Sequence, residues 1–158
     1  IITNDGAIQT FYTSKLNDLK NNYIQKILSD CDSKISILKI GYSSEEVSSW
    51  PIKKTLAIQW LALSGAQKTS ALSTTTYSLI INEAGGDSNA DKVTNTDLLA
   101  NKIIQLAVIF ESYVGSCVKA KKEAMKQINL INSEYSVAAA EIETIYSNIQ
   151  WPTVQIPQ

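Results

Sequence analysis

Residues 96–131 read TDLLANKIIQLAVIFESYVGSCVKAKKEAMKQINLI, and this stretch decides the fold class. Its apolar residues recur at steps of three and four, the period of a helix with one buried face. These positions are Leu99, Ile103, Leu106, Phe110, Tyr113, Cys117, Ala120, Ala124, Ile128 and Ile131. Such a helix spans about 54 Å at 1.5 Å per residue, which exceeds a compact bundle of this size. We therefore expect part of it to project or to pack on another chain.

Two helices are predicted upstream of this stretch by the same period. The first covers residues 12–40, and its lysines lie opposite the apolar face. The second begins after Ser43 and Glu46, which have the spacing of a capping box, and runs to about residue 63. Gly41 suits the end of the first helix, because glycine enters the left-handed conformation without steric cost.

Within the second helix, Trp50 precedes Pro51. Proline has no N–H to donate and clashes with the preceding turn. We therefore expect this helix to kink or restart at the Trp-Pro pair.

The middle of the chain gives weaker signals. Residues 65–70 are predicted to form a loop, and the Gly-Gly-containing stretch 85–95 a second loop. A short helix is predicted over residues 72–84. A strand over 77–81 competes with it, because β-branched and hydroxyl residues are frequent there. Asn95 or Thr96 is expected to cap the long helix.

A last helix is predicted to begin near Ser136 and to end before Trp151. The whole chain is therefore expected to be all-α, a bundle of four to five helices within residues 12–150. Residues 1–11 are expected to be an extended N-terminal segment and residues 151–158 an extended tail. A chain of 158 residues is long enough for one domain with its own core.

The composition excludes several classes of function. The 14 basic residues are all lysine, and 15 acidic residues balance them. Without arginine the chain lacks the planar fork that grips phosphate, and without histidine it lacks the commonest general base and metal ligand. The balanced charge gives no global field for nucleic acid or an anionic membrane. Apolar runs look too short to cross a bilayer, so we expect no membrane span.

No motif indicates catalysis, a cofactor or a metal. Glu45 and Glu46 fit a helix N-terminus, where the backbone dipole stabilises negative charge. Lys119, Lys121, Lys122 and Lys126 form a basic run that is expected to be a solvated face. Cys31 and Cys117 lie on apolar faces and are expected to be buried thiols, with a disulfide as the alternative. We therefore expect a protein that is not an enzyme.

Two stretches carry a resemblance to a known family. They are YSSEEVSSWPIKKTLAIQW at 42–60 and DLLANKIIQLAVIFESYVGSCVKAKKEAMKQI at 97–128. In this order they resemble small helical tail-fibre assembly or tail accessory proteins of tailed bacteriophages and prophages, over about residues 14–152. The chain departs from the family pattern at Lys119 and at Lys122-Glu123, where the family usually has Gly and Arg-Gln.

The resemblance implies contact with a phage tail-fibre or baseplate protein, with self-association as a further option. It also implies a location in the virion tail or in the host cytoplasm during assembly. The alternatives are a generic helical coiled-coil adaptor or oligomerisation module, and a membrane-active helical protein.

Nine residues are candidates for structural or interface roles. They are Trp50, Pro51, Trp60, Phe110, Tyr113, Gly115, Trp151, Val154 and Ile156. Both upstream tryptophans are expected to be buried against the long helix near Phe110 and Tyr113. Gly115 is expected at a close approach of two helices, which would offset its low helix propensity.

The tail has two readings. Val154 and Ile156 alternate with polar residues, so the tail is expected to dock on a partner in an extended form. The alternative is that it packs back on its own bundle through Trp151, or is disordered.

Overall fold

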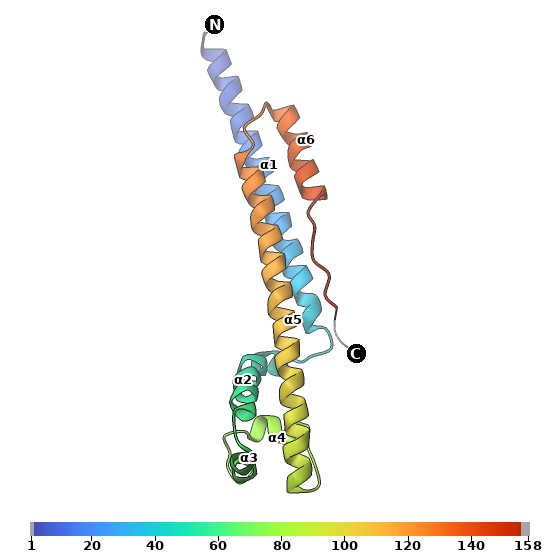
Figure 1. The fold of residues 1–158 in the computed structure, drawn as a ribbon. Coiled ribbons are helices and arrows are strands. Elements are labelled where there is room, and N and C mark those ends of the chain that lie inside the picture. The colour runs from blue at the N-terminus through green and yellow to red at the C-terminus, as the bar shows by residue number, and fades with distance from the viewer. Residues whose placement is uncertain (1, 156–158) are drawn as a thin grey trace. The chain divides into compact units, whose positions relative to one another are not determined.

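The computed structural model describes residues 2–155, and their side chains from residue 5 onward. Six α-helices and one 3-10 turn lie within this part of the chain (Figure 1). Their bounds are α1 Ile2–Ser36, η1 Ile37–Lys39, α2 Ser44–Leu61, α3 Gly65–Ala71, α4 Ser78–Ala84, α5 Asn89–Leu130 and α6 Tyr135–Ser147. No strand is present among these residues, so the all-α prediction is confirmed and the competing strand is wrong.

The described chain divides into two compact units. Unit 1 comprises the described residues of Ile1–Leu38 and Tyr113–Thr153, and unit 2 those of Lys39–Ser112 and Val154–Gln158. The long helix α5 contributes its first half to unit 2 and its second half to unit 1.

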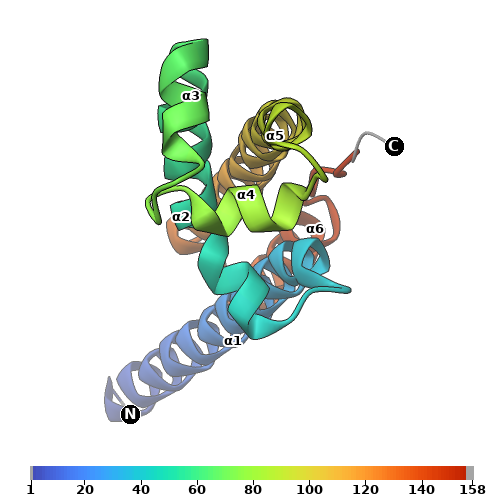
Figure 2. The same cartoon turned by 90° about the horizontal axis from the view of Figure 1, so that it is seen from below.

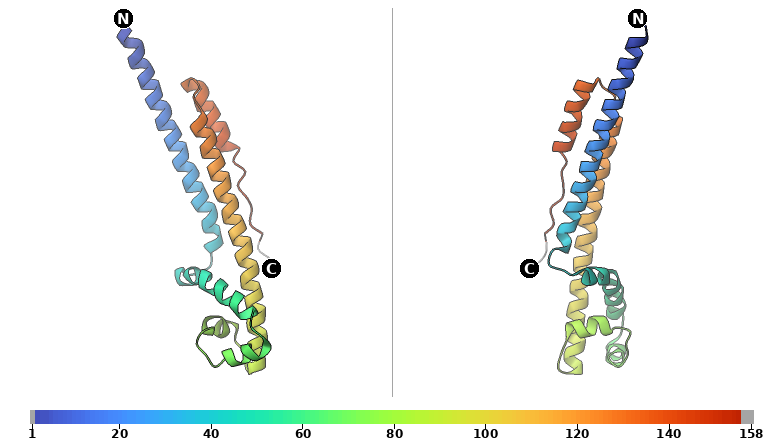
Figure 3. Two further views of the ribbon diagram at one scale, coloured as in Figure 1. Left: turned by 60° about the vertical axis from the view of Figure 1, so that its left-hand side comes forward. Right: turned by 180° about the vertical axis from the view of Figure 1, so that it is seen from behind.

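Unit 1 contains α1, the second half of α5 and α6. Its core consists of small and branched apolar residues from all three helices, which are Ile27, Ala124, Ile128, Ile131, Ala138 and Ile142. Helix α6 packs directly on α1, which Figure 3 shows from two sides. The expected extended segment over residues 1–11 is wrong, because α1 begins at Ile2. Its apolar spacing continues upstream through Tyr12 and Ile8.

Unit 2 contains α2, α3, α4 and the first half of α5. Ala57, Trp60, Ala71, Ile80, Ile81 and Ala100 form its buried core. Helix α4 packs across α2, and Figure 2 shows both helices beside the first turns of α5.

Three helix starts follow the same local chemistry. Ser43 and Glu46 form the predicted capping box at α2. Ser64 and Gln67 form another at α3, so the loop expected over 65–70 is wrong. At α5 the Ser88 hydroxyl accepts the backbone N–H of Asp91 at 3.1 Å. The long helix therefore starts before the positions expected to cap it.

Pro51 lies inside α2 and does not interrupt it. The helix is continuous from Ser44 to Leu61, so the expected restart at the Trp-Pro pair is wrong. The carbonyl of Pro51 accepts the Thr55 hydroxyl at 3.1 Å, one turn further along the helix. Gly41, at φ 88°, ends the preceding 3-10 turn in the left-handed conformation, as predicted.

Candidate interaction surface

Trp50 lies in a half-buried aromatic cluster of unit 2. Its ring is 5.2 Å from that of Tyr42 and 5.5 Å from that of Phe110, measured between centroids. The contact with Phe110 agrees with the prediction, but Trp50 is only half-buried and Pro51 is exposed. This cluster packs the first half of α2 against α5.

Trp60 is fully buried, as predicted, but at a different place on α5. Its indole N–H donates to Asp97 at 2.7 Å, and its ring packs 5.5 Å from Tyr77. From residue 97 to Phe110 the helix rises about 20 Å. The expectation that Trp60 lies near Phe110 and Tyr113 is therefore wrong, because helical spacing does not fix the level at which two helices cross.

Tyr113 belongs to unit 1, where it faces α1. Its hydroxyl donates to the carbonyl oxygen of Lys34 at 3.1 Å, and its ring is buried. Burial, followed by the neighbouring Cys117 thiol, raises the pKa of Tyr113. Cys31 and Cys117 are free and buried, as predicted, and burial also raises the pKa of the Cys31 thiol. Because nucleophilic attack needs the thiolate, Cys31 is a poor nucleophile.

Gly115 does not lie at a close helix approach. A Cβ atom built on it would meet nothing within 4 Å, and the residue is exposed on α5. The expected packing role is therefore wrong, and the helix carries this glycine without a compensating contact.

The C-terminal tail is extended where it is described, and its first residue packs inward. Trp151 is half-buried against the core of unit 1, together with Ile149. This packing agrees with the alternative in which the tail returns to its own bundle through Trp151. Val154 is half-buried, and Ile156 lies outside the described residues.

Helices α1 and α6 are joined by a network that the sequence analysis missed. Tyr23 donates to Glu143, and Tyr146 donates to Asp30 at 2.7 Å. The two tyrosine rings meet edge to face at 5.4 Å, and Lys26 lies 4.6 Å from the centre of the Tyr23 ring. Bonds from Tyr23 and then from Ser147 lower the pKa of Glu143. The partners are more than 100 residues apart in sequence, so no local pattern marks them.

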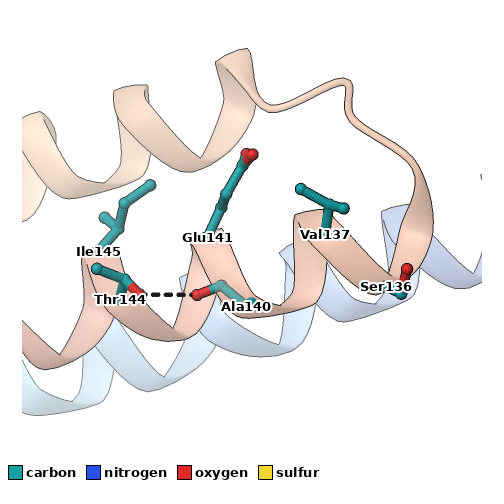
Figure 4. A pocket seen from close by; sticks show the side chains of 6 residues that line it. All are labelled: Ser136, Val137, Ala140, Glu141, Thr144 and Ile145. Atoms are coloured by element: carbon teal, nitrogen blue, oxygen red, sulfur yellow. Dashed lines mark hydrogen bonds between the residues drawn. The ribbon is translucent and has the colours of Figure 1, made fainter.

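A shallow groove runs along the exposed side of α6. It is lined by Ser136, Val137, Ala140, Glu141, Thr144 and Ile145. Figure 4 shows Val137, Glu141 and Ile145 pointing to the same side of the helix. Glu141 accepts the Ser133 hydroxyl at 3.0 Å, which ties it to the turn before α6. A single carboxylate in an open apolar groove suits contact with another chain better than acid-base chemistry.

Helix α5 has a length and composition that the expectation of no membrane span does not account for. By length and composition alone α5 is sufficiently apolar to cross a bilayer, and 11% of its most apolar 18-residue window is buried. Lys102 and Glu111 interrupt the apolar sequence of α5, so each uninterrupted apolar run is short although the helix as a whole is apolar. Core helices of soluble proteins can have the same length and composition.

Among the described residues, no cluster of three or more His, Cys, Asp or Glu side chains is placed to hold a metal ion. Comparisons with protein-family models, with curated proteins and with solved structures find no match.

Proposed function

We propose that this chain is a tail-associated structural or tail-fibre assembly protein of a tailed bacteriophage, acting through protein contacts. The sequence resemblance over about residues 14–152 gives the class. The observation that carries the mode of action is the number of large apolar side chains left exposed on both units. They include Ile8, Phe11, Ile52, Ile58, Leu98, Val108, Leu130 and Val137. In this proposal a partner chain covers some of these side chains on assembly.

The partner in this proposal is a fibre or baseplate polypeptide of the same particle. The chain then acts in the virion tail, or in the host cytoplasm while the tail assembles. The runner-up is a helical adaptor that assembles only with copies of itself, and a membrane-active role is the third option, for which α5 is long and apolar enough by composition alone.

Co-purification tests the proposal. A tagged chain co-expressed with the products of adjacent genes is expected to retain a fibre or baseplate polypeptide through washing. Val108→Glu should weaken this capture, because Val108 is apolar and 58% exposed on α5. Gln105→Glu is the matched control, since it adds the same charge to an exposed position one turn earlier.

Two results would overturn the proposal. Capture of neither polypeptide, with self-association of the chain alone, favours the adaptor. Flotation of the purified chain with liposomes of anionic and zwitterionic lipid favours the membrane role.

A further inference from the structure

The first turns of α1 carry an apolar stripe that is largely exposed, and among the described residues only Tyr135 of α6 packs beside it, 6.1 Å from the Tyr12 ring. Every residue from Asp5 to Lys15 is exposed, although the segment is helical throughout. The stripe consists of Ile8, Phe11 and Tyr12, which are 53%, 55% and 49% exposed. We call these three residues the N-terminal stripe. Figure 3 shows this part of α1 continuing beyond the turn between α5 and α6.

The N-terminal stripe continues an interface that is already formed. Further along the same face of α1, Leu16, Leu19 and Tyr23 pack against the core of unit 1. The apolar face of α1 therefore continues beyond Leu16 toward the N-terminus, although the core of unit 1 covers it only from Leu16 onward.

The segment has little intrinsic reason to be helical. It contains Gly6, Thr10 and Thr13, residue types that cost about 0.5–1 kcal/mol each relative to alanine inside a helix. These first turns belong to the 35-residue helix α1, but they lack the tertiary packing that gives most helices their stability. Contact with another apolar helix would supply the missing stabilisation.

The charged residues beside the stripe are placed symmetrically, which suits pairing with a second copy of the same helix. Asp5 precedes Ile8 by one turn, and Lys15 follows Tyr12 by one turn. The pairs Asp5 with Lys15 and Ile8 with Tyr12 are both symmetric about residue 10. In an antiparallel pair of such helices that cross at this level, each Asp5 meets a Lys15 and each Ile8 meets a Tyr12. In a parallel pair, Asp5 would meet Asp5 and Lys15 would meet Lys15, which is repulsive.

We propose that the N-terminal stripe binds the same stripe of a second copy of this chain, antiparallel and centred at the level of residue 10. Such an isologous two-fold contact is self-complementary. The contact is short and belongs to the weak class of interfaces. It does not depend on the proposed function, since it needs no fibre or baseplate polypeptide.

Analytical ultracentrifugation of the purified chain tests the dimer. The chain is expected to dimerise below about 1 mM, the weak end of specific association. Asp5→Lys and Lys15→Asp should each weaken dimerisation about fivefold or more, since each replaces two attractive contacts with repulsive ones. The double variant Asp5→Lys/Lys15→Asp should restore wild-type dimerisation. Lys102→Asp, which makes the same charge change at an exposed position of α5, should have no effect.

Disulfide trapping tests the direction of the pair. Chains carrying Ile8→Cys are mixed with chains carrying Tyr12→Cys under mild oxidation, while Cys31 and Cys117 stay buried. Cross-links between the two variants are expected. A monomer at all concentrations, failure of the double charge swap to restore dimerisation, or dominant Ile8→Cys self-cross-linking would each overturn the proposal. Circular dichroism of every variant verifies that the helices remain formed.

Discussion

At the scale of the residue, Asp97 shows how one carboxylate fixes an aromatic core. The same oxygen accepts the Trp60 indole N–H at 2.7 Å and the Lys68 ammonium at 2.8 Å. A buried indole N–H without an acceptor would lose free energy of folding. Asp97 therefore sets the level at which α2 meets α5, and the surrounding apolar residues supply the burial.

Trp60→Ala should lower the free energy of unfolding of unit 2 by about 3–5 kcal/mol, the usual cost of truncating a buried aromatic. Trp50→Ala is the matched comparison and should cost clearly less, because Trp50 is only half-buried. Urea unfolding monitored by far-ultraviolet circular dichroism measures both. Equal effects of the two variants would contradict the burial pattern.

Gly115→Ala should stabilise the protein by up to about 1 kcal/mol. Glycine inside an exposed helix is less favourable than alanine by this amount, and a Cβ atom at Gly115 meets nothing within 4 Å. Gly85→Ala is the contrasting variant and should destabilise, because Gly85 has φ 69°. The melting temperatures of the two variants should therefore shift in opposite directions.

At the scale of the element, helix starts are the features that sequence predicts well and helix pairings those that it predicts poorly. The Ser43–Glu46 box is complete within four residues, so its pattern is sufficient evidence. The Ser64–Gln67 box is equally local, so its pattern indicates the start of α3 where the Gly and Ser residues alone indicate a loop. The level at which Trp60 meets α5 depends on tertiary packing, and periodicity carries no information about it.

Helix α6 is expected to be held on α1 in a pH-dependent way through Tyr23 and Glu143. The folded-state pKa of Glu143 is lowered by the Tyr23 and Ser147 hydroxyls. Its contribution to stability is therefore present above the unfolded pKa of a glutamate and is lost as the pH falls through the lower, folded value. Tyr23→Phe should reduce the fall in stability on acidification from neutral pH.

The measurement is the melting temperature of wild type and Tyr23→Phe across the acidic range. Tyr42→Phe is a suitable control, because it removes a tyrosine hydroxyl from unit 2 and changes no residue of unit 1. Parallel pH curves for Tyr23→Phe and wild type would show that the Tyr23–Glu143 bond adds nothing in the folded state.

At the scale of the whole molecule, the two units have separate cores that share one helix. The core around Ile27, Ile128 and Ile142 contains no residue of unit 2, and the core around Trp60, Ile80 and Ala100 contains none of unit 1. The uninterrupted apolar spacing of α5 gives no sign in the sequence of the change from one core to the other. Units of this kind open separately when their contacts are mainly internal.

Hydrogen exchange in Trp60→Ala is expected to reveal this division. Because Trp60 is in the core of unit 2, the variant should lose protection at amides such as those of Ile80 and Ala100. The amides of Ile27 and Ile142 in unit 1 should keep wild-type protection. Ile142→Ala is the reciprocal variant, and protection should then fall in unit 1 and persist in unit 2. If either variant lowers protection equally in both units, α5 couples the two cores into one cooperative unit. The two units would then be compact but would not unfold independently.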